Sequence, residues 1–149
     1  MIRLLYFGFR IYCFIFRPKT IGVRVMLIQN GGALLVRQTY LPGWFIPGGG
    51  IDRGETLDEA ARREAREEVG AELGALELVG AYTSFGGFKS DHNILFLCTN
   101  FSIHGQPDRE IAEARFFPLD ALPEDLWPGH RLRLDEYCTD AKIPQFGEW

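Results

Sequence analysis

The chain has 149 residues, 46% of them apolar and 24% charged, which suits one globular domain with a full hydrophobic core. Its formal net charge of −4 gives no overall positive charge of the kind that binds nucleic acid, and we expect no nucleic-acid partner. Cys13, Cys98 and Cys138 lie far apart without a CxxC motif or a Cys/His cluster. Neither a zinc site nor a disulfide framework is indicated, and a reducing, cytoplasmic location is expected.

The first 19 residues form an apolar and aromatic segment, which we separate from a domain at 20–149. Arg3, Arg10 and Arg17 are spaced by seven, so on a helix they would nearly align and leave the other faces apolar. No small-residue cleavage site follows, and the run is short for a spanning helix. We favour a helix or strand packed on the domain or on a second copy in a homodimer. Attachment to a membrane surface and partial disorder are the alternatives.

A β-hairpin is predicted next. Residues 20–29 are rich in β-branched and apolar side chains, Asn30, Gly31 and Gly32 form a turn signal, and residues 33–38 return. Arg37 ends the returning strand beside the following loop. It either contacts a substrate phosphate or is an ordinary surface arginine.

The loop at 40–50 ends in three glycines, Gly48, Gly49 and Gly50. Glycine permits positive φ and close backbone approach, so successive N–H groups can face an anion. A tight connection without a binding role is the alternative. Trp44 and Phe45 in the same loop are expected to pack into the core.

A helix is predicted to begin near Thr56, which forms a capping box with Glu59, and to end at Gly70. Its apolar face carries Leu57, Ala60, Ala61, Ala65 and Val69.

Three glutamates share or border that apolar face. Glu64 and Glu68 fall in its middle, one turn apart, and Glu67 lies on its edge. Unpaired carboxylates there would be costly, so a bound Mg²⁺, Mn²⁺ or Ca²⁺ is indicated, since these ions prefer oxygen ligands. The alternative is a solvated helix whose charges pair internally. We expect Arg63 to pair with Glu59 and Glu67, and Arg62 and Arg66 to be solvated.

The stretch from Gly49 to Ala71 resembles the Nudix box, the signature of Nudix hydrolases. The match comprises Gly49, five residues, Glu55, seven residues, and then Arg63 to Ala71. Ala71 stands where a larger apolar residue is commoner.

The resemblance implies an α/β (α+β) Nudix fold, with a mixed β-sheet sandwiched between helices. It implies divalent-metal-dependent hydrolysis of a phosphoanhydride in a small nucleotide, a nucleoside diphosphate linked to another group, with Mg²⁺ or Mn²⁺ as cofactor. Gly49, Glu64, Glu67 and Glu68 would hold the metal, and Arg63 would orient the glutamates. Glu64 is our first choice for the residue that takes the proton of the attacking water.

Four further elements are predicted after the box. Strands are expected at 76–83, 93–101 and 114–119 and a helix at 127–137, followed by a loose tail. The turn at 85–91 could form a substrate wall, with Phe85 or Phe88 stacking on a base and Lys89 contacting phosphate. It could equally be an ordinary hairpin loop.

Many Nudix hydrolases have a further carboxylate in the loop that corresponds to residues 105–113. Glu110 is the second candidate for the proton acceptor, with Glu113 behind it, and a solvated loop acid is an equal alternative.

The substrate is not identified by the sequence. Markers typical of ADP-ribose, dinucleoside polyphosphate and NADH hydrolases are absent, since no proline lies between Pro47 and Pro107 and Phe88 stands near the place of the expected tyrosine. A non-catalytic nucleotide-binding module is the alternative function, although such modules usually lose box glutamates and none is missing here.

Overall fold

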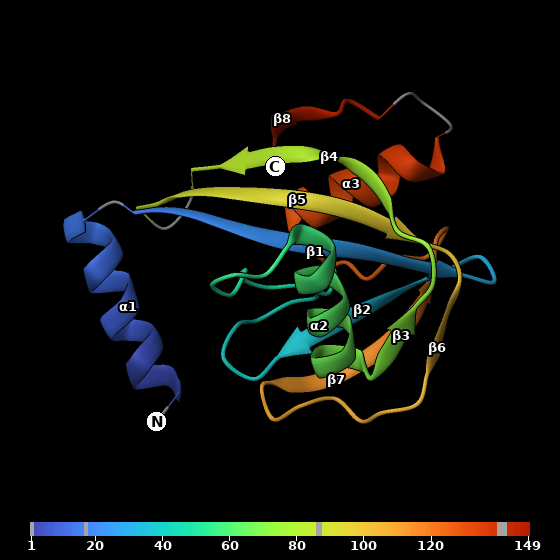
Figure 1. The fold of residues 1–149 in the computed structure, drawn as a ribbon, viewed down its shortest axis with the longest axis horizontal. Coiled ribbons are helices and arrows are strands. Elements are labelled where there is room, and N and C mark those ends of the chain that lie inside the picture. Colours follow the sequence, from blue (N-terminus) through green and yellow to red (C-terminus); the bar gives the residue numbers. More distant parts are fainter. Residues whose placement is uncertain (1, 17, 86–87, 140–142) are drawn as a thin grey trace.

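The computed structural model describes residues 2–16, 18–85, 88–139 and 143–149, without the side chains of 2–4, 6 and 13. Figure 1 shows how the elements are arranged. In chain order they are α1 (Ile2–Phe16), β1 (Lys19–Gln29), β2 (Gly32–Gln38), α2 (Leu57–Val69), β3 (Ala71–Leu73), β4 (Glu77–Ser84), β5 (Ser90–Cys98), β6 (Phe101–Ile103), β7 (Ile111–Pro118), α3 (Pro128–Cys138) and β8 (Phe146–Glu148).

The main sheet has six strands in the order β7-β2-β1-β5-β4-β8. The pairs β1–β5 and β4–β8 are parallel and the other neighbours are antiparallel. One buried cluster joins α2 to the sheet through Ala60, Ala61 and Ala65, and a second cluster on the other face includes Leu134 of α3. The predicted mixed sheet between helices is therefore confirmed (Figure 1).

The predicted hairpin is present, and its strands separate after the turn. Asn30 and Gly31 both have positive φ, 52° and 74°, the combination that suits a tight two-residue turn. Beyond it, the chain at 44–50 runs between the two strands. Val36 and Phe45 exchange backbone hydrogen bonds, and the N–H groups of Val25 and Val23 donate to Pro47 and Gly49, all at 2.9 Å. The glycine loop is thus fixed to the centre of the sheet.

The C-terminal tail is not loose, and the prediction for it was wrong. Strand β8 adds to the edge of the sheet parallel to β4. The backbone N–H of Trp149 donates to the Thr83 carbonyl at 2.8 Å. The indole packs near Tyr82 and His130, with ring centroids 5.8 and 5.0 Å apart. This strand pairs with residues more than sixty positions earlier, and such pairing leaves no local sequence signal.

Helix α1 lies beside the end of the sheet where β1 begins (Figure 1). Its described large apolar side chains are exposed. The expectation that this segment packs on the domain or on a second copy stays a prediction. Phe14 and Phe88 form an edge-to-face pair with centroids 5.0 Å apart. Among the described residues, no helix has both the length and the apolar character needed to cross a membrane.

Candidate active site

Helix α2 starts and ends as the sequence predicts, and this fixes the direction of its glutamates. Thr56 and Glu59 form the complete capping box. Gly70 has φ of 67° and its N–H bonds the carbonyls of Ala65 and Arg66. With both ends fixed, Glu64 and Glu68 project on the side of the helix that faces the glycine loop.

Glu68 is a nearly buried carboxylate, 8% exposed, held against that loop. The N–H of Gly48 donates to its Oε2 at 2.7 Å. Burial raises the pKa of Glu68 to about 7, and the Arg24 charge and the Gly48 hydrogen bond only partly oppose this effect. The negative charges of Glu64 and Asp108 raise it further. The Arg24 charge therefore does not offset the cost of burying this carboxylate in its ionised form.

Glu64 lies directly against Gly49. A Cβ built on Gly49 would come within 2.6–2.7 Å of the Glu64 carboxylate, so only glycine leaves that carboxylate room. At Gly48 a Cβ would collide with the backbone of Val23, and φ is +140°, whereas at Gly50 it would meet nothing within 4 Å. Burial raises the pKa of Glu64, against the effect of the neighbouring Arg63 guanidinium. The backbone packing at Gly48 thus requires glycine, and a Cβ at Gly49 would displace the Glu64 carboxylate from its position.

Arg63 connects the loop to the helix. Its guanidinium donates to both carboxylate oxygens of Glu55, at 2.9 and 3.0 Å, and to the Gly50 carbonyl at 2.9 Å. It also donates to Glu64 at 2.8 Å and to Glu67 at 3.2 Å. The expected pairing with Glu67 is confirmed. Glu59 instead caps the helix, where its carboxylate accepts from the backbone of Thr56 at 2.8 Å.

The three box glutamates have different environments. Glu64 and Glu67 share Arg63, Glu67 is half-exposed, and Glu68 is held by the loop. Within the described part of the chain, no three acidic, histidine or cysteine side chains converge in a ready-made metal site. A cation would have to compete with Arg63 for Glu64 and Glu67.

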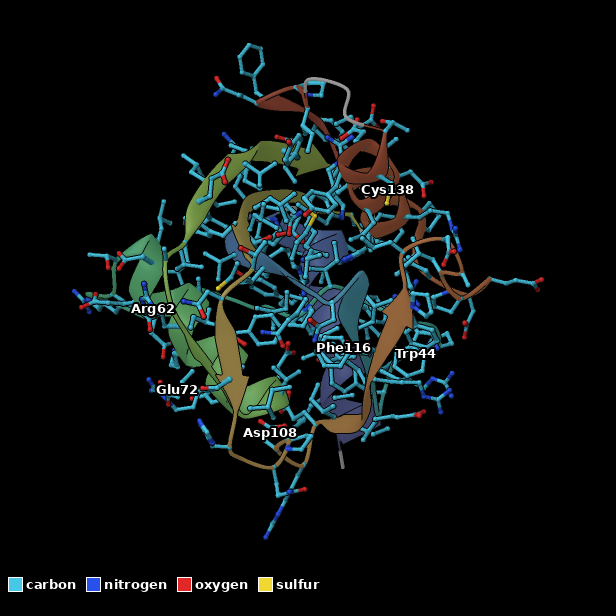
Figure 2. The ribbon with its side chains drawn as sticks, turned by 90° about the vertical axis from the view of Figure 1, so that its right-hand side faces the viewer. Trp44, Arg62, Glu72, Asp108, Phe116 and Cys138 are labelled. Atoms are coloured by element: carbon cyan, nitrogen blue, oxygen red, sulfur yellow. The ribbon has the colours of Figure 1, made fainter. Side chains whose placement is uncertain are left out.

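The other two helix arginines lie on the outer side of α2, where Figure 2 labels Arg62 and Glu72. Arg66 is exposed and pairs with Glu72 at 2.8 Å. Arg62 is not simply solvated as expected, because it donates to the Leu73 carbonyl at 2.6 Å and so ties α2 to β3.

Sequence reasoning missed three residues around the loop. Arg24 donates to the carbonyls of Ile46 and Gly48. The buried His130 of α3 accepts the Ile46 N–H on Nδ1 at 3.0 Å, and burial holds its pKa well below its usual value. Asp108, which Figure 2 labels, raises the pKa of Glu68. Its N–H donates to the Glu67 carbonyl at 3.0 Å. Of the three, only Arg24 could have been recognised from the sequence, because it is a single charged residue within an apolar central strand.

The remaining candidate residues lie outside this cluster. Arg37 approaches Glu113 and Asp125 at 3.9 and 3.7 Å and stacks over Trp44. Lys89 pairs with Asp91 at 3.0 Å. Phe85 is 70% exposed, and Phe88 contacts α1. Glu110 is exposed and its N–H donates to Asp108 at 2.8 Å. Each of these roles stays a prediction.

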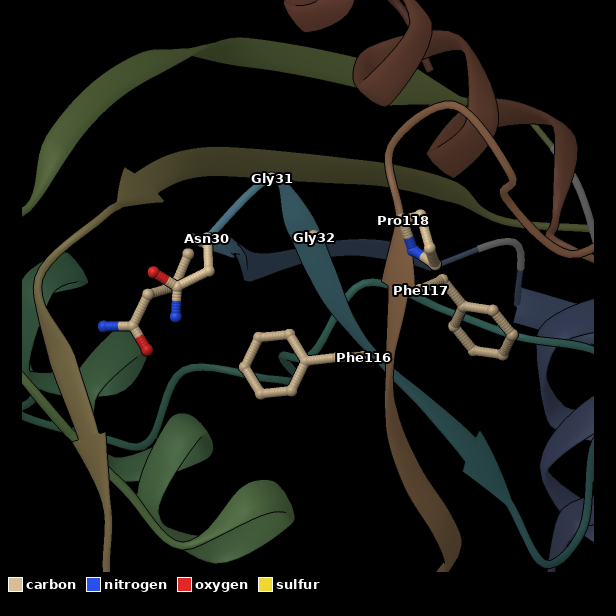
Figure 3. A pocket seen from close by; sticks show the side chains of 7 residues that line it. Asn30, Gly31, Gly32, Phe116, Phe117 and Pro118 are labelled. Atoms are coloured by element: carbon tan, nitrogen blue, oxygen red, sulfur yellow. The ribbon is translucent and has the colours of Figure 1, made fainter.

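A shallow pocket of about 310 Å³ lies at the turn between β1 and β2, at the other end of these strands from the glycine loop (Figure 3). Phe116 and Phe117 project to opposite sides of β7 there. The pocket is lined by the aromatic and proline side chains of β7, the glycines of the turn and the amide side chains of Gln29 and Asn30, without a charged side chain.

Comparison with known proteins places this geometry in a family. The sequence profile described as "NUDIX domain" matches residues 18–137. The chain belongs to the Nudix family. The arrangement of Glu64, Glu68 and Arg63 around the glycine loop is therefore the structure of a Nudix box.

Two curated relatives cover most of the Nudix chain. The NAD-capped RNA hydrolase NudC of Pseudomonas aeruginosa is 30% identical over 115 residues, which cover 71% of the chain and 39% of that protein. A putative 8-oxo-dGTP diphosphatase of Bacillus subtilis is 25% identical over 118 residues, covering 79% of the chain and 78% of that protein. The match therefore takes in about two fifths of the length of NudC.

Solved structures agree on the fold. The MutT NUDIX hydrolase from Burkholderia pseudomallei has a TM-score of 0.69 and 25% identity, and the match covers 78% of this chain and 96% of that one. A NUDIX hydrolase from Nitrosomonas europaea has a TM-score of 0.72 and 20% identity, and the match covers 85% of this chain and 93% of that one.

Proposed function

We propose that the protein hydrolyses a phosphoanhydride bond in a nucleoside diphosphate linked to another group, with a divalent cation. The observation that carries the proposal is the nearly buried Glu68 beside Glu64, both against the backbone of the glycine loop. A phosphoanhydride is anionic and repels a nucleophile, so its hydrolysis requires positive charge and a proton acceptor. A divalent cation would stabilise these two buried carboxylates in their ionised form, and such a substrate also needs one.

The donor set fits Mg²⁺ or Mn²⁺. Glu64, Glu67 and Glu68 would supply the oxygen ligands these ions prefer. Gly49, whose carbonyl also accepts the Val23 N–H, is the candidate backbone ligand. When bound, the ion would neutralise phosphate charge and lower the pKa of a water. It would also offset the free-energy cost of burying the ionised Glu68 carboxylate, which is a second reason to expect a cation here.

The other residues have supporting roles in this proposal. Glu64 takes the proton of the attacking water, and Glu110 is the second candidate. Arg63 positions Glu64 and Glu67 and holds Gly50 through its carbonyl. Arg37, Gly48, Gly50, Phe85, Phe88 and Lys89 are the candidates for substrate contact.

The substrate is a small nucleotide, and relatives suggest where to begin. Their names include a putative 8-oxo-dGTP diphosphatase and, over 53 residues at 47% identity, the nucleoside triphosphatase NudI of Escherichia coli. Nucleoside triphosphates, oxidised nucleotides and nucleotide sugars are thus the first panel. We place the activity in the cytoplasm, which the free Cys98 and Cys138 support.

The test is product release from this panel with Mg²⁺, Mn²⁺ or EDTA. We expect metal-dependent cleavage of one or a few compounds, and a loss of at least ~100-fold in kcat for Glu68→Gln. Glu72→Gln, which removes an exposed carboxylate just beyond α2, is the matched control and should turn over normally.

The rival function is a nucleotide-binding module without catalysis. Tight metal-dependent binding without cleavage across the panel would favour it. Unchanged turnover in Glu68→Gln would refute the ligand assignment.

A further inference from the structure

Helix α1 exposes apolar side chains over more than half of its circumference. Its described large apolar residues are 45–69% exposed, namely Leu5, Phe7, Phe9, Ile11, Tyr12, Phe14, Ile15 and Phe16. At 100° per residue these positions span about 220° around the axis, and Arg10 falls in the remaining arc. A helix of this kind is stable in water only when something covers it.

Among the residues that the structure describes, the domain leaves α1 largely uncovered. The aromatic contact between Phe14 and Phe88 joins them, yet Phe14 remains 58% exposed. The 15 described residues of α1 extend for about 22 Å, less than the ~30 Å hydrocarbon core of a bilayer. The apolar side chains of α1 are therefore shielded from water either by a second copy of the chain or by a membrane surface along which the helix lies.

The distribution of charged residues along the chain distinguishes a second copy from a membrane surface. All 20 acidic residues of the chain lie at Asp52 or beyond, whereas six of its 16 basic residues precede that point. Arg10 and Lys19 are both exposed. Two copies of α1 packed together would bring positive charges towards each other with no carboxylate in either helix to offset them. Anionic lipid headgroups complement both the charge and the apolar surface.

We propose that α1 is a membrane-surface anchor for anionic bilayers. Its apolar side chains enter the boundary between headgroups and acyl chains, while Arg10 and Lys19 contact the headgroups. The proposal is independent of the hydrolase activity, because no residue of the Nudix box takes part.

The test is co-sedimentation of the full chain with phosphatidylcholine vesicles, with and without phosphatidylglycerol. We expect at least tenfold stronger binding to the anionic vesicles, with the difference largely lost at 1 M salt, where the Debye length is about 3 Å. Arg10→Glu should weaken binding about tenfold. The double variant Leu5→Gln and Ile15→Gln, which keeps good helix formers, should weaken it more than tenfold.

Matched controls carry the same kinds of substitution at exposed positions outside α1. Arg109→Glu reverses an exposed charge outside α1, and Leu78→Gln removes an apolar side chain that is 61% exposed. Both should bind vesicles like the wild type. Equal binding to neutral and anionic vesicles, or full binding by the double variant, would overturn the proposal. So would a wild-type dimer by light scattering that the double variant converts to a monomer without any vesicle binding.

Discussion

Glu68 makes the stability of the metal-free protein depend on pH. Its pKa is about 7 in the folded protein and near 4.3 in an unfolded chain. Between these values the folded state holds the extra proton, so the free energy of unfolding falls as the pH rises. Glu64, whose pKa is also raised by burial, adds to the effect with the same sign.

We therefore expect urea denaturation in EDTA to give a lower free energy of unfolding at pH 8 than at pH 5. The difference attributable to Glu68 is on the order of 3 kcal/mol, at about 1.36 kcal/mol per pKa unit. Glu68→Gln should lose most of this slope and Glu72→Gln should keep it. A slope identical in wild type and Glu68→Gln would mean that the Glu68 carboxylate is ionised throughout.

Gly49 and Gly50 are neighbours, and adding a side chain should have opposite consequences at the two positions. A Cβ at Gly49 would press on the Glu64 carboxylate, whereas one at Gly50 has open space. We expect Gly49→Ala to lower the free energy of unfolding by about 1–3 kcal/mol, as overpacking does, and to weaken Mn²⁺ binding. Gly50→Ala should match the wild type in melting temperature. Equal melting temperatures for both variants would show that Glu64 moves aside freely.

At the scale of elements, Arg63 fastens helix α2 to the glycine loop. Lysine keeps the charge but cannot form the two parallel hydrogen bonds to Glu55 while also reaching Gly50. Arg63→Lys should lose about 1–3 kcal/mol of stability and most of the turnover. Arg66→Lys, which alters one exposed pair on the same helix, should change neither. Chemical denaturation would measure the stability of the two variants, and a steady-state assay would measure their turnover.

Sequence and structure agree best where the rules are local. The capping box at Thr56, the left-handed Gly70 and the buried alanines of α2 all follow from neighbouring residues. Leu57, expected on the same apolar face, is 38% exposed instead. The contacts that finish the site come from distant parts of the chain, as with His130 on Ile46 and Asp108 near Glu68. The edge strand β8 was missed for the same reason, since its partner β4 is remote in the sequence. Arg24 could have been found, because a charge in a buried central strand requires partners.

The whole molecule consists of a Nudix domain and a helix that stands largely free of it. We propose that residues 20–149 fold on their own, since Phe14–Phe88 is the aromatic contact between α1 and that domain among the described residues. Deleting residues 1–17 should leave the melting temperature and the turnover of soluble nucleotides close to wild type. A drop of more than about 5 °C would show that α1 is part of the folded domain.

Helix α1 ends at Phe16 and β1 begins at Lys19, so two residues join them. Two residues reach at most about 7 Å. Since β1 holds Gly49 through Val23, a bilayer that bound α1 would keep the glycine loop close to the membrane surface. The enzyme would then work within a thin layer above the lipid, where its encounters with membrane-borne substrates become a two-dimensional search.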